Sequence, residues 1–237
     1  MIACIVLFGG RGNRFKHSEP KQYYKIDGKS LLMHCLDSIK TIESLSQLII
    51  VREPIESVRV ENMVAEMESF DSQLEVKFCD SGPMRSDSVL NGLKACIPST
   101  KWVLIHDGAR AFCPPILLRS LCDHLLKYKA GVVPALPITD TVVELNAENT
   151  NTIAQSLSRE KLSRVQTPQA FSYSLILNAY LEGKENSFEG TDCSSYALKY
   201  GHEVRVIPGS EDNIKVTTPI DVEIAKHILK RRNVLKC

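Results

Sequence analysis

Short apolar runs that alternate with segments of helical periodicity constrain this chain more than any other feature. Continuous apolar runs of strand length cover residues 2–7, 102–105 and 131–136, and each contains β-branched side chains. Runs of this kind are typical of parallel strands that are buried on both faces. Between them, the spacing of apolar residues over 30–39 predicts a helix with Ser30 as its N-cap. The alternation predicts an α/β fold, a mostly parallel sheet with helices on both faces.

The remaining predicted elements continue the alternation of strands and helices. Further strands are expected over residues 47–51 and 74–78, and further helices over 55–67, 86–95, 114–127 and from Pro219 onward. Sheets of this class bind ligands at the carboxyl ends of their strands. The residues that carry chemistry should therefore come directly after the apolar runs.

Composition narrows the class of protein. The 237 residues suit a single domain spanning 1–237, and a net charge of +1 disfavours general binding to nucleic acid. Eight cysteines without a CxxC pair indicate neither a zinc site nor a disulfide scaffold, which favours a cytoplasmic protein. The chain contains no apolar run of about 18 residues, so no membrane span is expected.

One segment departs from the alternation. Two strand-like runs, residues 141–145 and 152–157, flank a polar stretch over 146–151, which predicts a β-hairpin with a long turn. We expect a projecting arm at about residues 139–158. The arm would pair with a second subunit, or else it is a surface excursion within one chain.

A loop rich in glycine and cations follows the first apolar run. Gly9, Gly10 and Gly12 allow the backbone to approach a ligand closely, and consecutive N–H groups in such a loop bind phosphate oxygens. The cations of the segment are Arg11, Arg14, Lys16, Lys21 and Lys25. The sequence matches neither a Walker loop nor a complete dinucleotide fingerprint. A flexible turn with solvated cations is the alternative to a polyphosphate site.

A second cluster, residues 80–89, follows the third predicted strand. Ser86 or Asp87 is expected to cap the next helix, and the alternative role for the cluster is contact of Ser88 with a base edge or a ribose.

Two more clusters occupy comparable positions. Asp107 follows the strand at 103–105 and suits Mg²⁺, which prefers carboxylate and phosphate oxygens, while Arg110 suits a phosphate group. An Asp–Arg ion pair is the simpler alternative, and His106 is expected to be structural. Lys215 lies between Ile214 and Val216, so a strand there would point it away from both, either toward a phosphate or into solvent.

Taken together, the motifs resemble one enzyme family. They are GGRGNRF with PKQY, SGPMRSDSVLNGL, VLIHDGAR, VPALPITDTV, SREKLSRVQTPQAF, TDCSSYAL and DNIKVTTPID. In this order, over nearly the whole chain, they resemble the 2-C-methyl-D-erythritol 4-phosphate cytidylyltransferases. The resemblance implies a Rossmann-like fold, a homodimer joined through the arm, dependence on Mg²⁺, and transfer of CMP from CTP to a polyol phosphate with release of pyrophosphate.

The resemblance also implies roles for individual residues. It assigns CTP phosphates to Gly9, Gly10, Gly12, Arg14, Lys21 and Lys215, cytosine to Gly82 and Ser88, and ribose and metal to Asp107. It assigns the acceptor phosphate to Arg110, Thr191, and Thr141 and Arg159 from the second subunit. The residues expected to act in catalysis are Arg14, Lys21, Arg159 and Lys215.

The chain departs from the usual family pattern at a few positions. Phe8 adds bulk beside the glycine loop, where a small residue is frequent, and Gly108 replaces a frequent alanine. Glu144 stands near a position where lysine is common, which favours ribitol 5-phosphate cytidylyltransferase as an alternative. A nucleotide-binding regulatory protein without catalysis is an alternative of another class.

Overall fold

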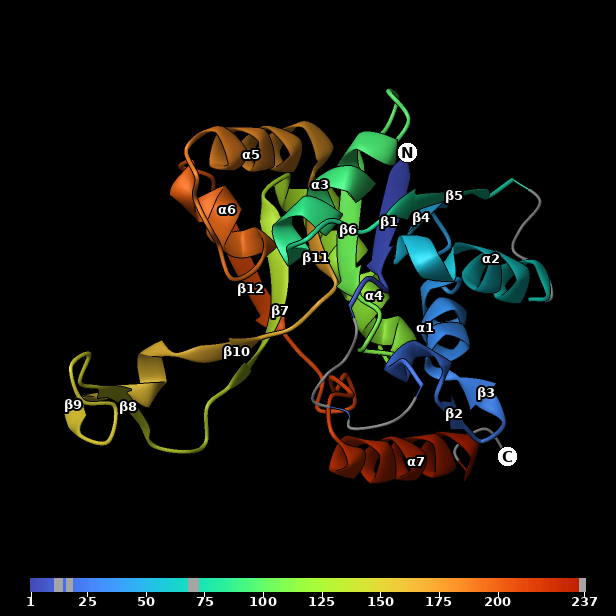
Figure 1. Ribbon diagram of the computed structural model, residues 1–237. Helices are drawn as coiled ribbons and strands as arrows, with labels where there is room; N and C mark the ends of the chain where they lie inside the picture. The colour runs from blue at the N-terminus through green and yellow to red at the C-terminus, as the bar shows by residue number, and fades with distance from the viewer. Residues whose placement is uncertain (11–14, 16–18, 68–72, 235–237) are drawn as a thin grey trace.

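The computed structural model describes residues 1–10, 15, 19–67 and 73–234. Within that part of the chain, eight strands form one mixed sheet in the order β10-β7-β11-β6-β1-β4-β5, with β12 also paired to β7. Helices cover both faces of the sheet (Figure 1). The α/β fold predicted from the alternation is confirmed.

The strands of the main sheet pair in both directions. β1 pairs in parallel with β4 and β6, β4 with β5, and β12 with β7. β11 runs antiparallel to β6 and β7, and β10 runs antiparallel to β7, which the alternation did not predict. The bounds are β1 Ile2–Leu7, β4 Leu45–Arg52, β5 Glu75–Asp80, β6 Trp102–Asp107, β7 Gly131–Pro137, β10 Ser163–Val165, β11 Gln169–Ser172 and β12 Val204–Pro208.

The helices of the described chain connect these strands. Their bounds are α1 Leu31–Ile39, α2 Ser57–Ala65, α3 Arg85–Ala95, α4 Pro115–Tyr128, α5 Tyr173–Glu185, α6 Cys193–Lys199 and α7 Pro219–Val234. A small ribbon of β2 Lys25–Ile26 and β3 Lys29–Ser30 precedes α1. None of the described helices combines the length and the apolar character that crossing a bilayer requires.

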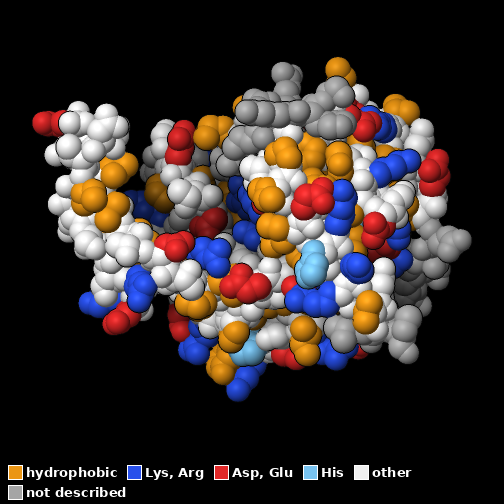
Figure 2. Space-filling view, turned by 90° about the horizontal axis from the view of Figure 1, so that it is seen from below, with side chains coloured by type: hydrophobic (Ala, Val, Ile, Leu, Met, Phe, Trp, Pro, Cys, Tyr) orange, Lys and Arg blue, Asp and Glu red, His pale blue; other side chains and the backbone are white. Residues whose placement is uncertain are grey.

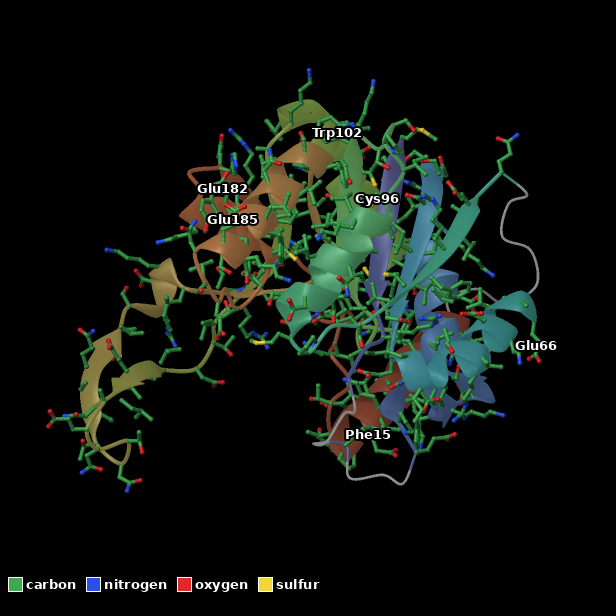
Figure 3. The ribbon with its side chains drawn as sticks, turned by 45° about the horizontal axis from the view of Figure 1, so that its top comes forward. Phe15, Glu66, Cys96, Trp102, Glu182 and Glu185 are labelled. Atoms are coloured by element: carbon green, nitrogen blue, oxygen red, sulfur yellow. The ribbon has the colours of Figure 1, made fainter. Side chains whose placement is uncertain are left out.

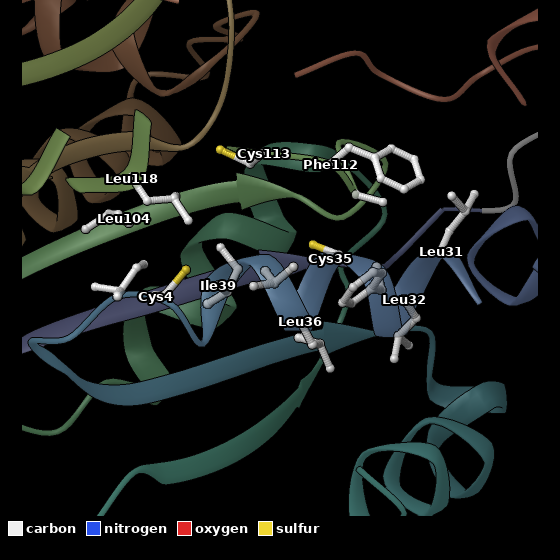
Figure 4. Close-up of a cluster of buried hydrophobic side chains, with 14 of the residues drawn as sticks. Cys4, Leu31, Leu32, Cys35, Leu36, Ile39, Leu104, Phe112, Cys113 and Leu118 are labelled. Atoms are coloured by element: carbon white, nitrogen blue, oxygen red, sulfur yellow. The ribbon is translucent and has the colours of Figure 1, made fainter. Parts of the chain in front are cut away.

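Alternate residues of the central strand β1 pack into two separate hydrophobic cores. Cys4 and Val6 pack with α1 and α4 on one face, whereas Ile5 and Leu7 pack with α3, α5 and α6 on the other. Figure 4 shows the first core, where α1 directs Cys35 and its apolar neighbours toward the sheet. Because both faces of β1 are buried, its sequence is continuously apolar rather than alternating.

Local capping explains where two helices begin. The Ser30 Oγ accepts a hydrogen bond from the Met33 N–H at 3.2 Å, so the predicted N-cap of α1 is confirmed. The predicted N-cap of α3 is wrong, because α3 starts at Arg85 with Met84 as the capping position. Asp87 instead occupies the third helical position, where its carboxylate reaches back to the Met84 N–H at 3.3 Å.

The predicted helix at 55–67 is shorter in the structure. α2 covers Ser57–Ala65, and a 3₁₀ turn over Pro54–Glu56 precedes it. Proline fixes φ and lacks an N–H group, so it suits this entry turn better than a helix interior.

The predicted hairpin is present and stands apart from the main sheet. β8 Val142–Leu145 and β9 Ile153–Leu157 pair only with each other among the described strands. Figures 1 and 2 show this arm projecting from the body of the molecule. Leu145 and Ile153 are 49% and 65% exposed, so the arm leaves apolar side chains uncovered in a single chain.

Candidate active site

A cleft of about 350 Å³ opens where β1 and β6 end. Residues 7–10 and 107–109 line it from the two strands, Lys21 and Gln22 from a 3₁₀ turn, Arg85 from α3, and Lys215 from the loop before α7. Figure 2 views the molecule from this end, and Lys and Arg side chains gather in the recess between the arm and the body. In Figure 3, Trp102 at the start of β6 and Phe15 in the loop after β1 lie at opposite ends of the sheet.

Strand pairing accounts for this convergence. β1 and β6 are adjacent and parallel with Leu7 opposite Asp107, so the loops that follow them emerge at the same edge. The Gly108 N–H then donates to the Leu7 oxygen at 3.0 Å, which joins the two loops. The prediction that the unusual residues would follow strands therefore holds for Gly9, Gly10 and Asp107.

Asp107 lies between two cations in the cleft. Its Oδ1 accepts from Nε and Nη2 of Arg85 at 3.2 and 3.0 Å, and its Oδ2 accepts from Nζ of Lys215 at 2.7 Å. Burial by itself would raise the pKa of Asp107, but the two cations hold this pKa well below its usual range. The carboxylate is therefore ionised at neutral pH. The ion pair expected as the simpler alternative exists, but with Arg85 and Lys215 rather than with Arg110.

Sequence reasoning gave no role to Arg85. Its position between Gly82 and Ser88, in the cluster after β5, was the one indication in the sequence that Arg85 could belong to the site. What the sequence could not show is that α3 carries this guanidinium across the strand ends to Asp107, 22 residues along the chain.

His106 and Thr167 fix the backbone beside Asp107. His106 is fully buried, and its ring contacts the Arg110 oxygen through Nε2 and Thr167 Oγ1 through Nδ1, both at 3.1 Å. Burial lowers the pKa of His106 to about 4, so the ring is neutral near pH 7. Thr167 Oγ1 also accepts from the Asp107 N–H at 3.0 Å. The structural role expected for His106 is consistent with these contacts, whereas Thr167 was not singled out from the sequence.

Lys215 reaches the cleft, although not from a strand. The segment around it has no regular secondary structure, so the predicted strand is wrong. One backbone hydrogen bond, from the Val216 N–H to the Ala109 oxygen at 2.8 Å, fixes the segment against the strand ends. Val216 is fully buried and the Lys215 side chain is 41% exposed, so the alternation still gave the correct direction.

Gly82 and Ser88 lie beside the cleft rather than in its lining. The Gly82 N–H donates to Ser88 Oγ at 3.0 Å, and this hydroxyl donates to the Met84 oxygen at 3.1 Å. The hydroxyl thereby shapes the loop between β5 and α3. That loop touches the glycine loop closely, because a Cβ on Gly9 would lie 2.3 Å from Ser81 Cβ. Glycine is thus required at position 9 for the two loops to meet.

The other predicted site residues either do not line this cleft or lie outside the residues that the structure describes. Arg110 is half-buried behind the strand ends, where Nη1 donates to the Asn213 oxygen at 2.7 Å and Nε has no hydrogen-bond partner among the described residues. Thr141, Thr191 and Arg159 are exposed, and Arg159 donates to the Thr139 oxygen at 2.7 Å. Gly12 and Arg14 lie outside the described residues.

Comparisons with known proteins agree on one family. The IspD family model, described as 2-C-methyl-D-erythritol 4-phosphate cytidylyltransferase, matches residues 2–231. The chain belongs to this family. The protein of that name from Geobacillus kaustophilus is 36% identical over 229 residues, with 97% of both chains covered. Its counterpart from Desulforamulus reducens is 32% identical over 235 residues, with 98% of this chain and 97% of the relative covered.

Solved structures support the same conclusion for this chain. The crystal structure of 4-diphosphocytidyl-2C-methyl-D-erythritol synthase from Anaerococcus prevotii superposes with a TM-score of 0.83 at 25% identity, covering 97% of this chain and 98% of that one. The Thermus thermophilus cytidylyltransferase, at 23% identity and a TM-score of 0.73, shares the fold. The family resemblance drawn from the motifs is thus confirmed, and with it the prediction of a nucleotidyltransferase.

Proposed function

We propose that this chain, acting as a single domain over residues 1–237, transfers CMP from CTP to 2-C-methyl-D-erythritol 4-phosphate and releases pyrophosphate. The observation that carries the proposal is the cleft in which Asp107 lies between Arg85 and Lys215, with Gly9, Gly10 and Lys21 around it. A glycine-lined recess with several cations at strand ends suits a nucleoside triphosphate.

The phosphates of CTP would lie against the glycine loop. Gly10 has φ +141°, a conformation that side chains disfavour, and no atom of the described chain outside its immediate neighbours lies within 4 Å of where a Cβ would be. A glycine at this position suits a loop whose backbone approaches phosphate oxygens closely. Lys21 and Lys215 line the cleft, and we propose Gly12 and Arg14, which lie outside the described residues, as further phosphate ligands. Gly82 and Ser88 would contact the cytosine.

Asp107 would hold the divalent cation, which we propose to be Mg²⁺. The donor chemistry fits, because Mg²⁺ commonly uses one or two carboxylates together with substrate phosphates. No cluster of three potential metal ligands occurs among the described residues, so an all-protein cage is not part of the proposal. When bound, the ion would neutralise charge on the phosphates.

The chemistry requires positioning more than proton transfer. A phosphate oxygen of the acceptor attacks the α-phosphorus in line, forming the new P–O bond, while the bond to the bridging oxygen breaks and pyrophosphate leaves with the electron pair. The acceptor phosphate is already anionic near pH 7, so no general base is needed. Arg14, Lys21 and Lys215 would offset the charge that builds on the α-phosphate and the leaving group.

A second copy of the chain would complete the acceptor site. Thr141 and Arg159 flank the projecting arm and are exposed, which suits a role in the partner's cleft better than in their own. An isolated two-stranded hairpin is marginal in water, so docking on another subunit would also stabilise it. Arg110 and Thr191 would contact the acceptor from the same chain as the cleft. We place this dimer in the cytoplasm, consistent with the seven described cysteines, which are unpaired.

Pyrophosphate release tests the proposal. The protein is incubated with CTP and Mg²⁺, and in parallel with 2-C-methyl-D-erythritol 4-phosphate or ribitol 5-phosphate. We expect turnover with the methylerythritol phosphate alone. Turnover with ribitol 5-phosphate alone would refute the acceptor and retain the chemistry. No turnover with either, despite measurable CTP binding, would refute the enzymatic proposal.

A further inference from the structure

Arg85 is anchored to the protein through three of its nitrogens. Two of its N–H groups bind Asp107 Oδ1, and Nη1 lies 3.7 Å from Cys193 Sγ. The Tyr180 hydroxyl donates to the same sulfur at 3.3 Å, so α5 and α6 both support the contact. A guanidinium held at three nitrogens has little freedom to leave its carboxylate.

Lys215 holds the same carboxylate in a different way. Its ammonium makes one hydrogen bond to Asp107 Oδ2 at 2.7 Å, and its side chain extends from a loop and is 41% exposed. The Asp107 side chain is 13% exposed, so few other groups can reach it. Lysine is a flexible point charge, which makes it the cation that can exchange.

Both oxygens of Asp107 therefore accept hydrogen bonds from a protein cation. Each oxygen keeps a further lone pair, but a divalent ion bound to Asp107 would lie close to both cations, and repulsion between like charges would favour displacing one of them. The contacts above favour release of Lys215, whose ammonium would then be free for a phosphate oxygen in the same cleft.

We propose that Arg85 is a positioning residue: it holds Asp107 from the protein side so that Lys215 exchanges from Asp107 to the triphosphate when metal and nucleotide bind. This rests on the proposed function for the identity of the ligands. Without Arg85, Asp107 would keep its contact with Lys215, so Lys215 would be retained there, and the carboxylate would lose its fixed orientation.

Calorimetric titration of CTP, with Mg²⁺ and with EDTA, tests this directly and needs no acceptor. The gain in CTP affinity that Mg²⁺ gives should fall about 10-fold or more in Arg85→Met, since a ligand-orienting partner is worth roughly that much in metal affinity. Arg85→Lys keeps the positive charge but lacks the paired N–H groups of the guanidinium, so its Mg²⁺-dependent gain in CTP affinity should lie between those of the unsubstituted protein and Arg85→Met. Affinity in EDTA should change much less.

A double-mutant cycle with Asp107→Asn separates this role from direct phosphate binding. If Arg85 acts through Asp107, adding Arg85→Met to Asp107→Asn produces little further loss of the Mg²⁺-dependent gain. If Arg85 binds phosphate itself, Arg85→Met weakens CTP binding equally with and without Mg²⁺ and adds to Asp107→Asn. That result overturns the proposal.

Arg232→Met is the matched control. Arg232 is 25% exposed against 32% for Arg85, and it bonds Asp212 and the Phe112 oxygen away from the residues that line the cleft. Arg232→Met should leave the CTP affinities with Mg²⁺ and with EDTA unchanged, while it lowers Tm by about as much as Arg85→Met does. Equal effects of the two substitutions would refute a specific role for Arg85. So would a CTP affinity in the unsubstituted protein that Mg²⁺ does not alter. Failure of pyrophosphate release with intact Mg²⁺-dependent binding would instead count against the proposed function alone.

Discussion

Replacing Gly108 by alanine is expected to destabilise the fold through a clash with one ring. Its new Cβ would lie 2.3 Å from Cε1 and 2.4 Å from Cδ1 of Phe8, and 2.9 Å from the Leu7 oxygen. Phe8 is 5% exposed and belongs to the core that contains α1, so its ring can give way only by disturbing the side chains packed around it. The two departures from the family pattern are thus complementary, because Phe8 fills the space that an alanine at 108 would need.

The structure sets the size of the effect. Forcing a methyl group into a packed core typically costs about 1–3 kcal/mol, and the overlap of more than 1 Å places Gly108→Ala in the upper half of that range. Phe8→Ala alone should cost about 3–5 kcal/mol by emptying its site. In the Phe8→Ala background, the same Gly108→Ala should cost only about 1 kcal/mol, since the ring is gone and the 2.9 Å contact with the Leu7 backbone oxygen is what still has to relax.

Urea unfolding of the four proteins in this cycle measures the coupling from the midpoints at constant m-value. Gly131→Ala is the matched control, because its Cβ would meet the ring of Phe171 at 2.8 Å in another part of the sheet. Phe8→Ala should not rescue Gly131→Ala. An equal cost of Gly108→Ala in both backgrounds would refute the idea that Phe8 occupies its space.

Three further predictions concern catalysis, assembly and pH. Lys21→Ala should lower kcat on the order of 10²-fold by removing charge that acts in the transition state, and a change confined to KM in steady-state kinetics would contradict that role. Arg159→Ala and Lys21→Ala subunits, each inactive alone, should recover about a quarter of the activity when they are mixed and allowed to exchange. Half of a random mixture is heterodimer, and each heterodimer has one intact site of two. No recovery despite proven exchange would argue against a shared site. Asp221→Ala should cost about 1 kcal/mol at pH 7, because the carboxylate accepts from the backbone and hydroxyls of Thr217 and Thr218 at the start of α7. Burial alone would raise the pKa of Asp221, but these hydrogen bonds lower it, so as the pH falls the unfolded chain is protonated first. The stabilisation therefore disappears as the pH falls below about 4. Urea midpoints of the two proteins at pH 7 and pH 3 check this, and the same difference between their midpoints at both pH values would refute it.

Much of the site could be located from the sequence because it lies at strand ends. The apolar run at β1 fixed where the glycine loop begins, and the run at β6 fixed the place of Asp107. These assignments need only the periodicity of burial and the direction of the strands. Ser30 was likewise predictable, since an N-cap bonds within its own first turn.

Partners across the fold were not predictable in the same way. Arg85 was overlooked because its contact with Asp107 depends on how far α3 reaches over the strand ends. Thr167 contacts Asp107 because β11 returns antiparallel beside β6, an order of strands that the alternation does not specify. The strand expected at Lys215 failed because that segment has a single described backbone bond to the sheet region, through Val216.

The sequence by itself determined the α/β class, the edge of the sheet that carries the chemistry and the hairpin arm, because burial of apolar side chains and turn formation act over a few neighbouring residues. Only the tertiary structure decided that Asp107 is held by Arg85 and Lys215, and that Phe8 and Gly108 share one space. Those outcomes depend on strand order and on the approach of side chains distant in the sequence, which local patterns leave open.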